Sequence, residues 1–301
     1  MTTDTPTDVF EEHRPVLMGV AYRMLGRVAD AEDVVQDAWL RWSAADRAEV
    51  REPRAYLVRV TTRLAIDRLR QVKARGEAYV GPWLPEPYVT DFGDTVTDFG
   101  DTVPDTAERA VLADSVSLAV LVVLESLSPL ERAVFVLREA FGYPYADIAA
   151  MLDRGEPAVR QLAGRARKHV DERRPRYEVD PAQRRDLTER FLAAAAEGDL
   201  AGLMKMLAPD VRLIGDSGGK SKAPLRILET ADNVGRFLVA VAGKGIPEMS
   251  FRFLELNGGP AVLILSGGTP DSVFQVDVSA GRIRSVYIVR NPDKLRSLAS
   301  A

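Results

Sequence analysis

The chain has 301 residues, a formal net charge of -4, two histidines and no cysteine. This length predicts two or three domains, and the absence of cysteine excludes disulfides and thiol chemistry. The absence of cysteine also disfavours a zinc site, and we expect no metal site and no cofactor. No apolar run approaches the roughly 20 residues that a membrane span requires, and the polar N-terminus has no signal core. We therefore expect a cytoplasmic protein without a membrane partner.

The first block begins with two amphipathic helices. Apolar spacing over residues 9–25 predicts a helix that ends at Gly26, and Asp30 is expected to open the next helix because helix N-termini favour acceptors and negative charge. The second helix buries a stripe that ends at Trp42. Its other side is polar, and on its own this pattern is more typical of a solvated helix surface than of an interface. That side carries Glu32, Asp33, Gln36, Asp37 and Arg41.

Pro53 begins a third helix, at a position where its missing N–H costs nothing. Residues 51–75 contain eight basic and two acidic residues, a net charge of +6. Arginines are common on helix surfaces, but this density on a helix that is apolar on two sides favours a helix that lies against phosphates. The candidate DNA-binding side chains are Arg54, Arg59, Arg63 and Arg70.

An acidic linker separates this block from the next one. Residues 77–108 contain eight acidic residues, no Lys or Arg, the sequence WLPEP and a tandem repeat of the heptamer TDFGDTV. Prolines, glycines and evenly spaced charge disfavour a packed core. The sequence therefore predicts a linker or an inserted loop.

The second block, residues 109–177, is predicted to be helical and to contain a helix-turn-helix. Ser128 and Glu131 form a capping box with Pro129 at the first helical position. A short helix over 146–152 is followed by a break, and Pro157 opens a second helix with a basic outer face. Such a helix fits a major groove, although an ordinary three-helix bundle is the alternative. The outward residues are Arg160, Gln161, Gly164, Arg165 and Lys168.

These two blocks resemble a known family. The sequences DAEDVVQDAWLRW and PRAYLVRVTTRLAIDRLR resemble region 2 of the extracytoplasmic-function (ECF) sigma factors of bacterial RNA polymerase, and residues 127–170 resemble their region 4. The resemblance implies that the polar face of the second helix docks on the β′ and β subunits of core RNA polymerase. It also implies that the basic third helix melts and reads the –10 element as single-stranded DNA, while the last helix reads double-stranded DNA at –35. Glu156 and Pro157 replace the small hydroxyl cap of many relatives.

Residues 182–301 add a third domain. Two helices, a short strand at 211–214 and a helix capped by Asn233 precede four predicted strands: 249–256, 261–265, 273–278 and 283–289. This order predicts a curved antiparallel sheet wrapped on helices, an α+β roll. It resembles the SnoaL-like members of the NTF2-like superfamily. The expected architecture is thus multidomain: two all-α sigma domains, over residues 1–76 and 109–177, and a C-terminal α+β domain.

Three short motifs favour a regulatory role for this domain. Together, WLPEP in the linker, the glycine loop at 216–220 and NPDKL at 291–295 resemble the SigJ-like subgroup of ECF sigma factors. The resemblance implies a contact between the C-terminal domain and the sigma part, in place of a separate anti-sigma protein or in addition to one. No catalytic residue is assigned. The alternative is a DNA-binding regulator whose C-terminal domain binds or turns over a small molecule in its cavity. The candidate regulatory residues are Trp83, Pro85, Asp216, Gly218, Gly219, Lys220, Asn291, Pro292 and Asp293.

Overall fold

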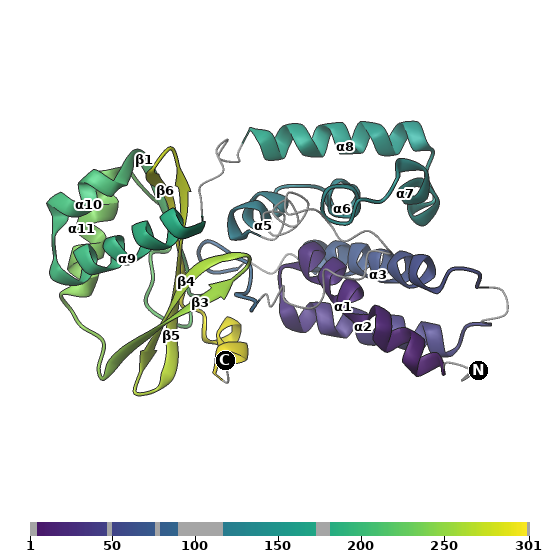
Figure 1. The fold of residues 1–301 in the computed structure, drawn as a ribbon, viewed down its shortest axis with the longest axis horizontal. Coiled ribbons are helices and arrows are strands. Elements are labelled where there is room, and N and C mark those ends of the chain that lie inside the picture. The colour runs from purple at the N-terminus through teal and green to yellow at the C-terminus, as the bar shows by residue number, and fades with distance from the viewer. Residues whose placement is uncertain (1–4, 47–49, 76–78, 90–116, 173–180, 300–301) are drawn as a thin grey trace. The chain divides into compact units, whose positions relative to one another are not determined.

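A computed structural model of the chain describes residues 5–46, 50–75, 79–89, 117–172 and 181–299 (Figure 1). The chain forms two compact units, which are described separately below. The first contains Met1–Glu77 and Asp91–Arg174, and the second contains Ala78–Thr90 and Pro175–Ala301. The tandem heptamer lies outside the described residues. Residues 79–89, which the sequence assigns to the linker, belong to the second unit.

The first unit begins with three helices that share one core, including Leu17, Trp42 and Leu57. The N-terminus of α1 is closed by a capping box between Thr5 and Asp8, and its C-terminus ends at Gly26 in the left-handed conformation, as the sequence predicts. Pro53 begins α3, also as predicted. The bounds are α1 Pro6–Leu25, α2 Val28–Ser43 and α3 Pro53–Arg75.

The prediction that Asp30 opens α2 is wrong by two residues. Gly26 turns the chain tightly, so that Arg27 becomes the N-cap in an extended conformation and α2 starts at Val28. Asp30 lies in the first turn, where it is buried and accepts a 2.6 Å hydrogen bond from Arg68 on α3. Its carboxylate links α2 to α3, and the N-cap Arg27 makes no side-chain cap hydrogen bond.

The rest of the first unit contains the predicted helix-turn-helix. The capping box of Ser128 and Glu131 begins α6, and the Ser128 hydroxyl, which bonds to Glu131, lowers the pKa of that carboxyl. The turn after α7 contains Asp153 at φ 54°, and Gly155 is the N-cap of α8. Helix α7 starts one residue before the predicted position. The bounds are α5 Leu118–Leu124, α6 Pro129–Phe135, a π-helical turn η2 Val136–Ala140, α7 Tyr145–Leu152 and α8 Glu156–Asp171.

The second unit is an α+β roll on a six-stranded sheet of order β2-β1-β6-β5-β4-β3. Strands β3 to β6 form the predicted antiparallel meander. The sheet is nevertheless mixed, because β1 runs parallel to β6. The bounds are α9 Pro181–Glu197, α10 Leu200–Met206, β1 Leu207–Asp216, β2 Leu228–Glu229, α11 Ala231–Ala242, β3 Met249–Leu256, β4 Gly259–Ser266, β5 Thr269–Ser279, β6 Arg282–Val289, and 3-10 turns η3 Pro292–Lys294 and η4 Arg296–Leu298.

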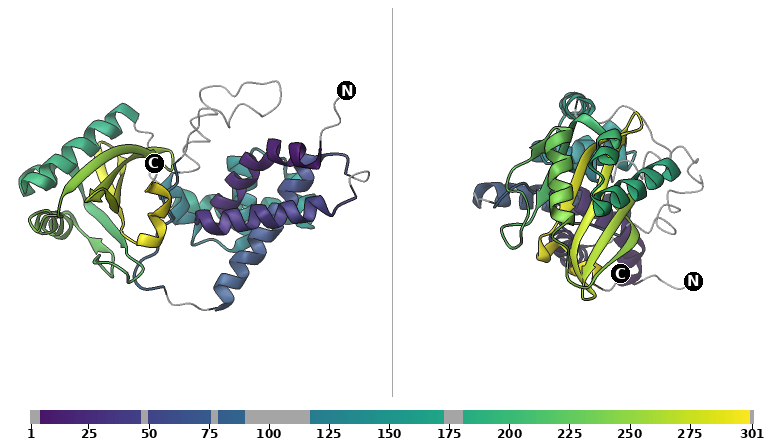
Figure 2. Two further views of the ribbon diagram at one scale, coloured as in Figure 1. Left: turned by 90° about the horizontal axis from the view of Figure 1, so that it is seen from below. Right: turned by 90° about the vertical axis from the view of Figure 1, so that its left-hand side faces the viewer.

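The helices α9, α10 and α11 cover one face of this sheet, whereas the 3-10 turns at the C-terminal end lie on its other side (Figures 1 and 2). Phe191, Leu203, Val234 and Ile283 are among the residues that fill the core between helices and strands. Asn233 does not cap α11 as predicted: Thr230 is the N-cap, and the Asn233 amide donates to the Glu229 carbonyl. Within the described ranges, no helix is long and apolar enough to cross a membrane.

Candidate functional site

The polar face of α2 is open to solvent. All five residues that the sequence assigns to polymerase docking (Glu32, Asp33, Gln36, Asp37 and Arg41) are exposed, while Val34, Val35 and Ala38 are buried on the other side of the helix. Leu40 lies on the same helix and its side chain is 57% exposed. Acidic groups around an exposed leucine make this helix suited to bind a partner surface that is both basic and apolar.

The four candidate arginines of α3 divide into two kinds. Arg59 and Arg70 are exposed; Arg59 stacks 5.4 Å from the Tyr56 ring, and Arg70 pairs with Asp67 at 3.2 Å. Arg63 is exposed too, but its Nε donates a 2.9 Å bond to the Met151 carbonyl of α7.

The fourth arginine, Arg54, is half-buried beside Tyr143. Burial raises the pKa of the Tyr143 hydroxyl, and the nearby Arg54 opposes that rise. Arg54 and Arg63 therefore face the helix-turn-helix within the first unit.

The outer face of α8 is accessible along its length. The predicted –35 residues Arg160, Gln161, Gly164, Arg165 and Lys168 are all exposed. At Gly164 a Cβ atom would meet nothing within 4 Å, so this face is open to a large ligand. Its arginines pair with carboxylates: Arg165 is 3.1 Å from Glu131, and Arg167 is 2.7 Å from Glu139. The sequence prediction did not include Arg167.

A buried cluster in the second unit holds the linker segment 79–89 on the C-terminal domain. The Asp216 carboxylate, which is fully buried at the end of β1, accepts bonds from the Tyr79 hydroxyl, from the Leu84 amide at 2.8 Å and from Lys294 Nζ at 2.7 Å. We call these residues, together with Trp83 and Asn291, the Asp216 hub. Three donors on one carboxylate satisfy the negative charge in a site without water access.

Lys294 completes the hub from the opposite side. Its side chain is 3% exposed, and Nζ also donates to the Leu84 carbonyl. The Trp83 ring centroid lies 4.2 Å from Nζ and the Tyr79 ring centroid lies 5.1 Å away, so both rings stabilise the ammonium by cation–π attraction. One lysine thus contacts a carboxylate, a backbone carbonyl and two aromatic rings.

The glycine loop allows the linker segment to approach this closely. Gly218 and Gly219 have φ values of 56° and 75°, which favour glycine. A Cβ on Gly218 would lie 2.5 Å from the Asn291 amide, and one on Gly219 would lie 3.1 Å from Val80. The Asn291 amide donates to the Tyr79 hydroxyl at 2.9 Å. A side chain at Gly218 would therefore clash with Asn291, and one at Gly219 would crowd Val80.

A second anchor holds the far end of the linker segment. Asn257 follows β3 with a φ of 51° and is buried. Its backbone amide donates to the Tyr88 carbonyl at 2.9 Å, and its side-chain oxygen accepts from the Tyr88 amide at 3.3 Å. Val89 forms an antiparallel bridge with Leu256. The linker segment is therefore fixed to the C-terminal domain at both ends.

The structure brings most of the predicted regulatory residues to this site. Trp83, Asp216, Gly218, Gly219 and Asn291 contribute to the contacts above, and Lys220 pairs with Asp293 beside them. Pro85 is buried, and Pro292 starts η3.

Sequence reasoning missed Tyr79, Leu84 and Lys294. Of these, Lys294 could have been predicted from the sequence. It lies within NPDKL, and a lysine next to an aspartate-bearing turn is a candidate partner for Asp216. The contribution of Leu84 is a backbone amide and carbonyl, which no sequence motif encodes.

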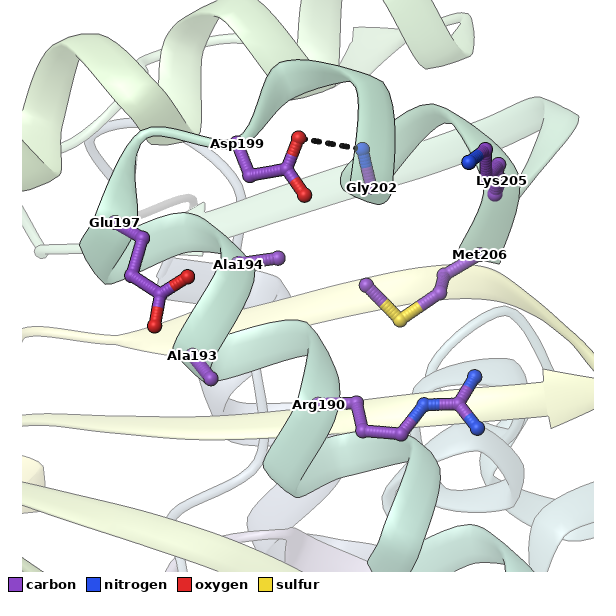
Figure 3. Close-up of a pocket in the computed structure, with 8 residues that line it drawn as sticks. All are labelled: Arg190, Ala193, Ala194, Glu197, Asp199, Gly202, Lys205 and Met206. Carbon is purple, nitrogen blue, oxygen red and sulfur yellow. Dashed lines mark hydrogen bonds between the residues drawn. The ribbon is translucent and has the colours of Figure 1, made fainter.

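A separate pocket of about 330 Å³ lies between α9 and α10 (Figure 3). Arg190 and Lys205 bring positive charge to it, and Glu197 and Asp199 bring negative charge. Asp199 is already engaged as the N-cap of α10, where it accepts from the Gly202 amide at 2.8 Å. The pocket does not include Asp210, which pairs with Arg284, or Asp216. It offers room for a small polar molecule.

Comparisons with known proteins agree with this organisation. The family model for Sigma-70 region 2 matches residues 9–75, and that for Sigma-70 region 4 matches residues 117–170. The ECF RNA polymerase sigma factor SigJ of Mycobacterium tuberculosis is 38% identical over 296 residues, covering 95% of this chain and 91% of SigJ. The probable ECF RNA polymerase sigma factor SigI of the same species is 32% identical over 297 residues, covering 98% of this chain and 96% of SigI.

A solved structure of one of these relatives has the same fold as this chain. The crystal structure of M. tuberculosis SigJ matches with a TM-score of 0.72 and 35% identity, over 95% of this chain and 96% of that one. The predicted order of two helical sigma domains followed by an α+β domain is confirmed. The chain belongs to the ECF family of RNA polymerase sigma factors, which bind core polymerase and direct transcription initiation at promoters.

Proposed function

We propose that this sigma factor docks on core RNA polymerase through the exposed polar face of α2. The support is the accessibility of Glu32, Asp33, Gln36, Asp37 and Arg41 beside the exposed Leu40. Replacing Asp37 by Lys should abolish co-purification with core polymerase, because the interface would then bring like charges together. Glu11→Lys is the matched control, since Glu11 is an exposed acid on α1, outside the proposed surface. Equal retention of both variants would contradict the assignment.

We further propose that α3 contacts the –10 element and α8 the –35 element. Their exposed basic faces are the support, and the action is binding without covalent chemistry. If about six phosphates are neutralised, duplex affinity should fall with salt with a log–log slope of roughly -5. Arg70→Gln should reduce the magnitude of that slope by about 1. An affinity independent of salt would contradict both surfaces.

The C-terminal domain is proposed to regulate this activity by holding the linker between the two sigma domains. The observation that carries the proposal is the Asp216 hub, in which a buried carboxylate and a buried lysine both bind segment 79–89. A linker fixed to a folded domain restricts the positions that regions 2 and 4 can reach together. The domain would work in the cytoplasm, in place of a separate anti-sigma protein or in addition to one.

Run-off transcription with purified core polymerase tests this regulation. The variant is the double substitution Asp216→Asn with Lys294→Met, which removes both hub charges and leaves no buried ion unpaired. Promoter output should differ from that of the wild-type chain. Gly268→Ala, in a turn of the same domain away from the hub, should leave output unchanged. Unchanged output of the double variant at every promoter would contradict regulation through the hub.

A second candidate function is the binding of a small molecule by the C-terminal domain. The pocket between α9 and α10, with Arg190 and Lys205 among its lining residues, is the specific observation that favours it. Native mass spectrometry of the full chain after extraction from cells should then reveal a bound molecule that Lys205→Met loses. A wild-type mass that matches the sequence alone would argue against this candidate.

A further inference from the structure

Tyr145, the first residue of α7, has an unusual set of neighbours. The guanidinium of Arg138, from η2, lies 4.8 Å from the centre of its ring, and that of Arg160, from α8, lies 4.7 Å from it. Both arginines are attracted to the electron-rich ring. Arg160 is at the start of the proposed –35 reading helix, whereas Tyr145 belongs to the preceding helix. The ring therefore supports a candidate base-reading side chain from outside the reading helix.

Arg160 is also held along its own helix. Its Nε donates to Glu156 at 2.9 Å, and the Arg160 side chain remains 60% exposed. A ring and a carboxylate thus hold the guanidinium while it is still open to solvent. Long side chains lose rotamer entropy when they bind, and a side chain that is already held loses less.

Arg167 lies two turns further along α8 and is held by a carboxylate of η2. It pairs with Glu139 at 2.7 Å. The pKa of its guanidinium is raised, mainly by the hydrogen bond to Glu139 and additionally by the nearby Tyr145 hydroxyl. Tyr145 therefore interacts with two arginines of α8, Arg160 at its ring and Arg167 at its hydroxyl.

We propose that Tyr145 is a positioning residue for promoter recognition, which acts with Glu156 to present the Arg160 guanidinium in one orientation to a base pair of the –35 element. The proposal rests on the assignment of α8 as the –35 reader. Bidentate contact of an arginine with guanine requires a defined guanidinium plane, so the base preference depends on groups that fix this plane. Tyr145 itself does not need to touch DNA for this role.

The carboxylate of Glu156 has a second consequence. It lies at the N-terminus of α8, where it repels phosphates that would otherwise pair with Arg160. Glu156→Gln should therefore strengthen binding to arbitrary sequences while it weakens discrimination between base pairs. This combination is not expected from a residue that only stabilises the helix.

The test uses the full chain bound to core polymerase and a duplex library randomised upstream of the –10 element. Sequencing of bound DNA gives the preference at each base pair. Arg160→Ala should remove the preference at one pair. Tyr145→Leu should lower that same preference about fivefold, the effect of one lost cation–π contact, and Tyr145→Phe should preserve it because the ring remains. Lys168→Gln, a control on the same helix, should weaken all sequences alike.

The outcomes separate this inference from the assignment of α8. If Arg160→Ala changes no preference, Arg160 reads no base pair and the inference is wrong; the role of α8 as the –35 reader is wrong if the wild-type chain itself shows no base preference in that region. If Arg160→Ala removes the base preference and Tyr145→Leu leaves it unchanged, the positioning role of Tyr145 is wrong. A uniform loss of affinity in Tyr145→Leu, with the base preference intact, also overturns it, because a purely structural role predicts that result. Thermal unfolding of each variant verifies that the domain remains folded.

Discussion

Two ion pairs of this molecule, one buried and one exposed, differ in what they can do. Asp216 and Lys294 pair with side-chain exposures of 0% and 3%, whereas Arg160 and Glu156 pair with exposures of 60% and 39%. A buried charge that loses its partner is costly, but an exposed pair contributes little to stability. The buried pair is therefore suited to hold a segment in place, and the exposed pair leaves its guanidinium accessible to phosphates and bases.

The largest effect is expected from Asp216→Asn. This isosteric change leaves the Lys294 ammonium buried without a counter-ion, which costs about 3–5 kcal/mol. In calorimetry of the full chain, the unfolding transition of the C-terminal unit should fall by about 10 °C. Adding Lys294→Met should recover part of the loss, because no buried ion remains unpaired. A single variant as stable as the wild type would show that the pair is not buried in solution.

A smaller effect is expected at the glycine loop. Gly219→Ala and Gly268→Ala both place a side chain at positive φ, at 75° and 78°, which costs about 1–2 kcal/mol each. Only the first also brings a Cβ to 3.1 Å from Val80 of the linker segment. We expect Gly219→Ala to lower the same calorimetric transition by about 3 °C more than its control, for an extra cost of about 1 kcal/mol. Equal shifts would mean that the linker segment is not packed on the loop.

The smallest effect is expected at an exposed pair. Glu139→Gln removes the partner of Arg167, whose side chain is 46% exposed. The free energy of unfolding of the sigma part should change by no more than about 1 kcal/mol, since exposed pairs contribute little to stability. This free energy is measured by urea unfolding of the full chain, monitored by far-UV circular dichroism. A loss as large as that of Asp216→Asn would remove the distinction between the two kinds of pair.

Local signals predicted the helical parts well and the sheet less completely. The capping box at Ser128 and the proline at Pro53 place helix starts correctly, because the groups that cap a helix are close in sequence. The predictions that Asp30 and Asn233 begin their helices were wrong, because each is a typical cap residue that lies inside its helix. The parallel pairing of β1 with β6 joins segments about 70 residues apart, and no short pattern encodes it.

The candidate site shows the same limit. The motifs WLPEP, the glycine loop and NPDKL were all identified in the sequence, and their residues meet in the structure. The contacts that build the site join residues that are distant in sequence: Leu84 and Asp216 are 132 positions apart. From their composition, residues 77–108 were predicted to be one acidic spacer. The composition does not reveal that part of this spacer is held by the C-terminal domain, because a segment held by another domain needs no core of its own.

Amide hydrogen exchange of the linker segment in the full chain, without polymerase, tests the central claim most directly. If the Asp216 hub holds segment 79–89, the Leu84 amide, which donates to the buried Asp216 carboxylate, exchanges far more slowly than an unstructured amide. This protection should disappear in Asp216→Asn and persist in Gly268→Ala. Exchange of the Leu84 amide at the unprotected rate in the wild-type chain would contradict the account.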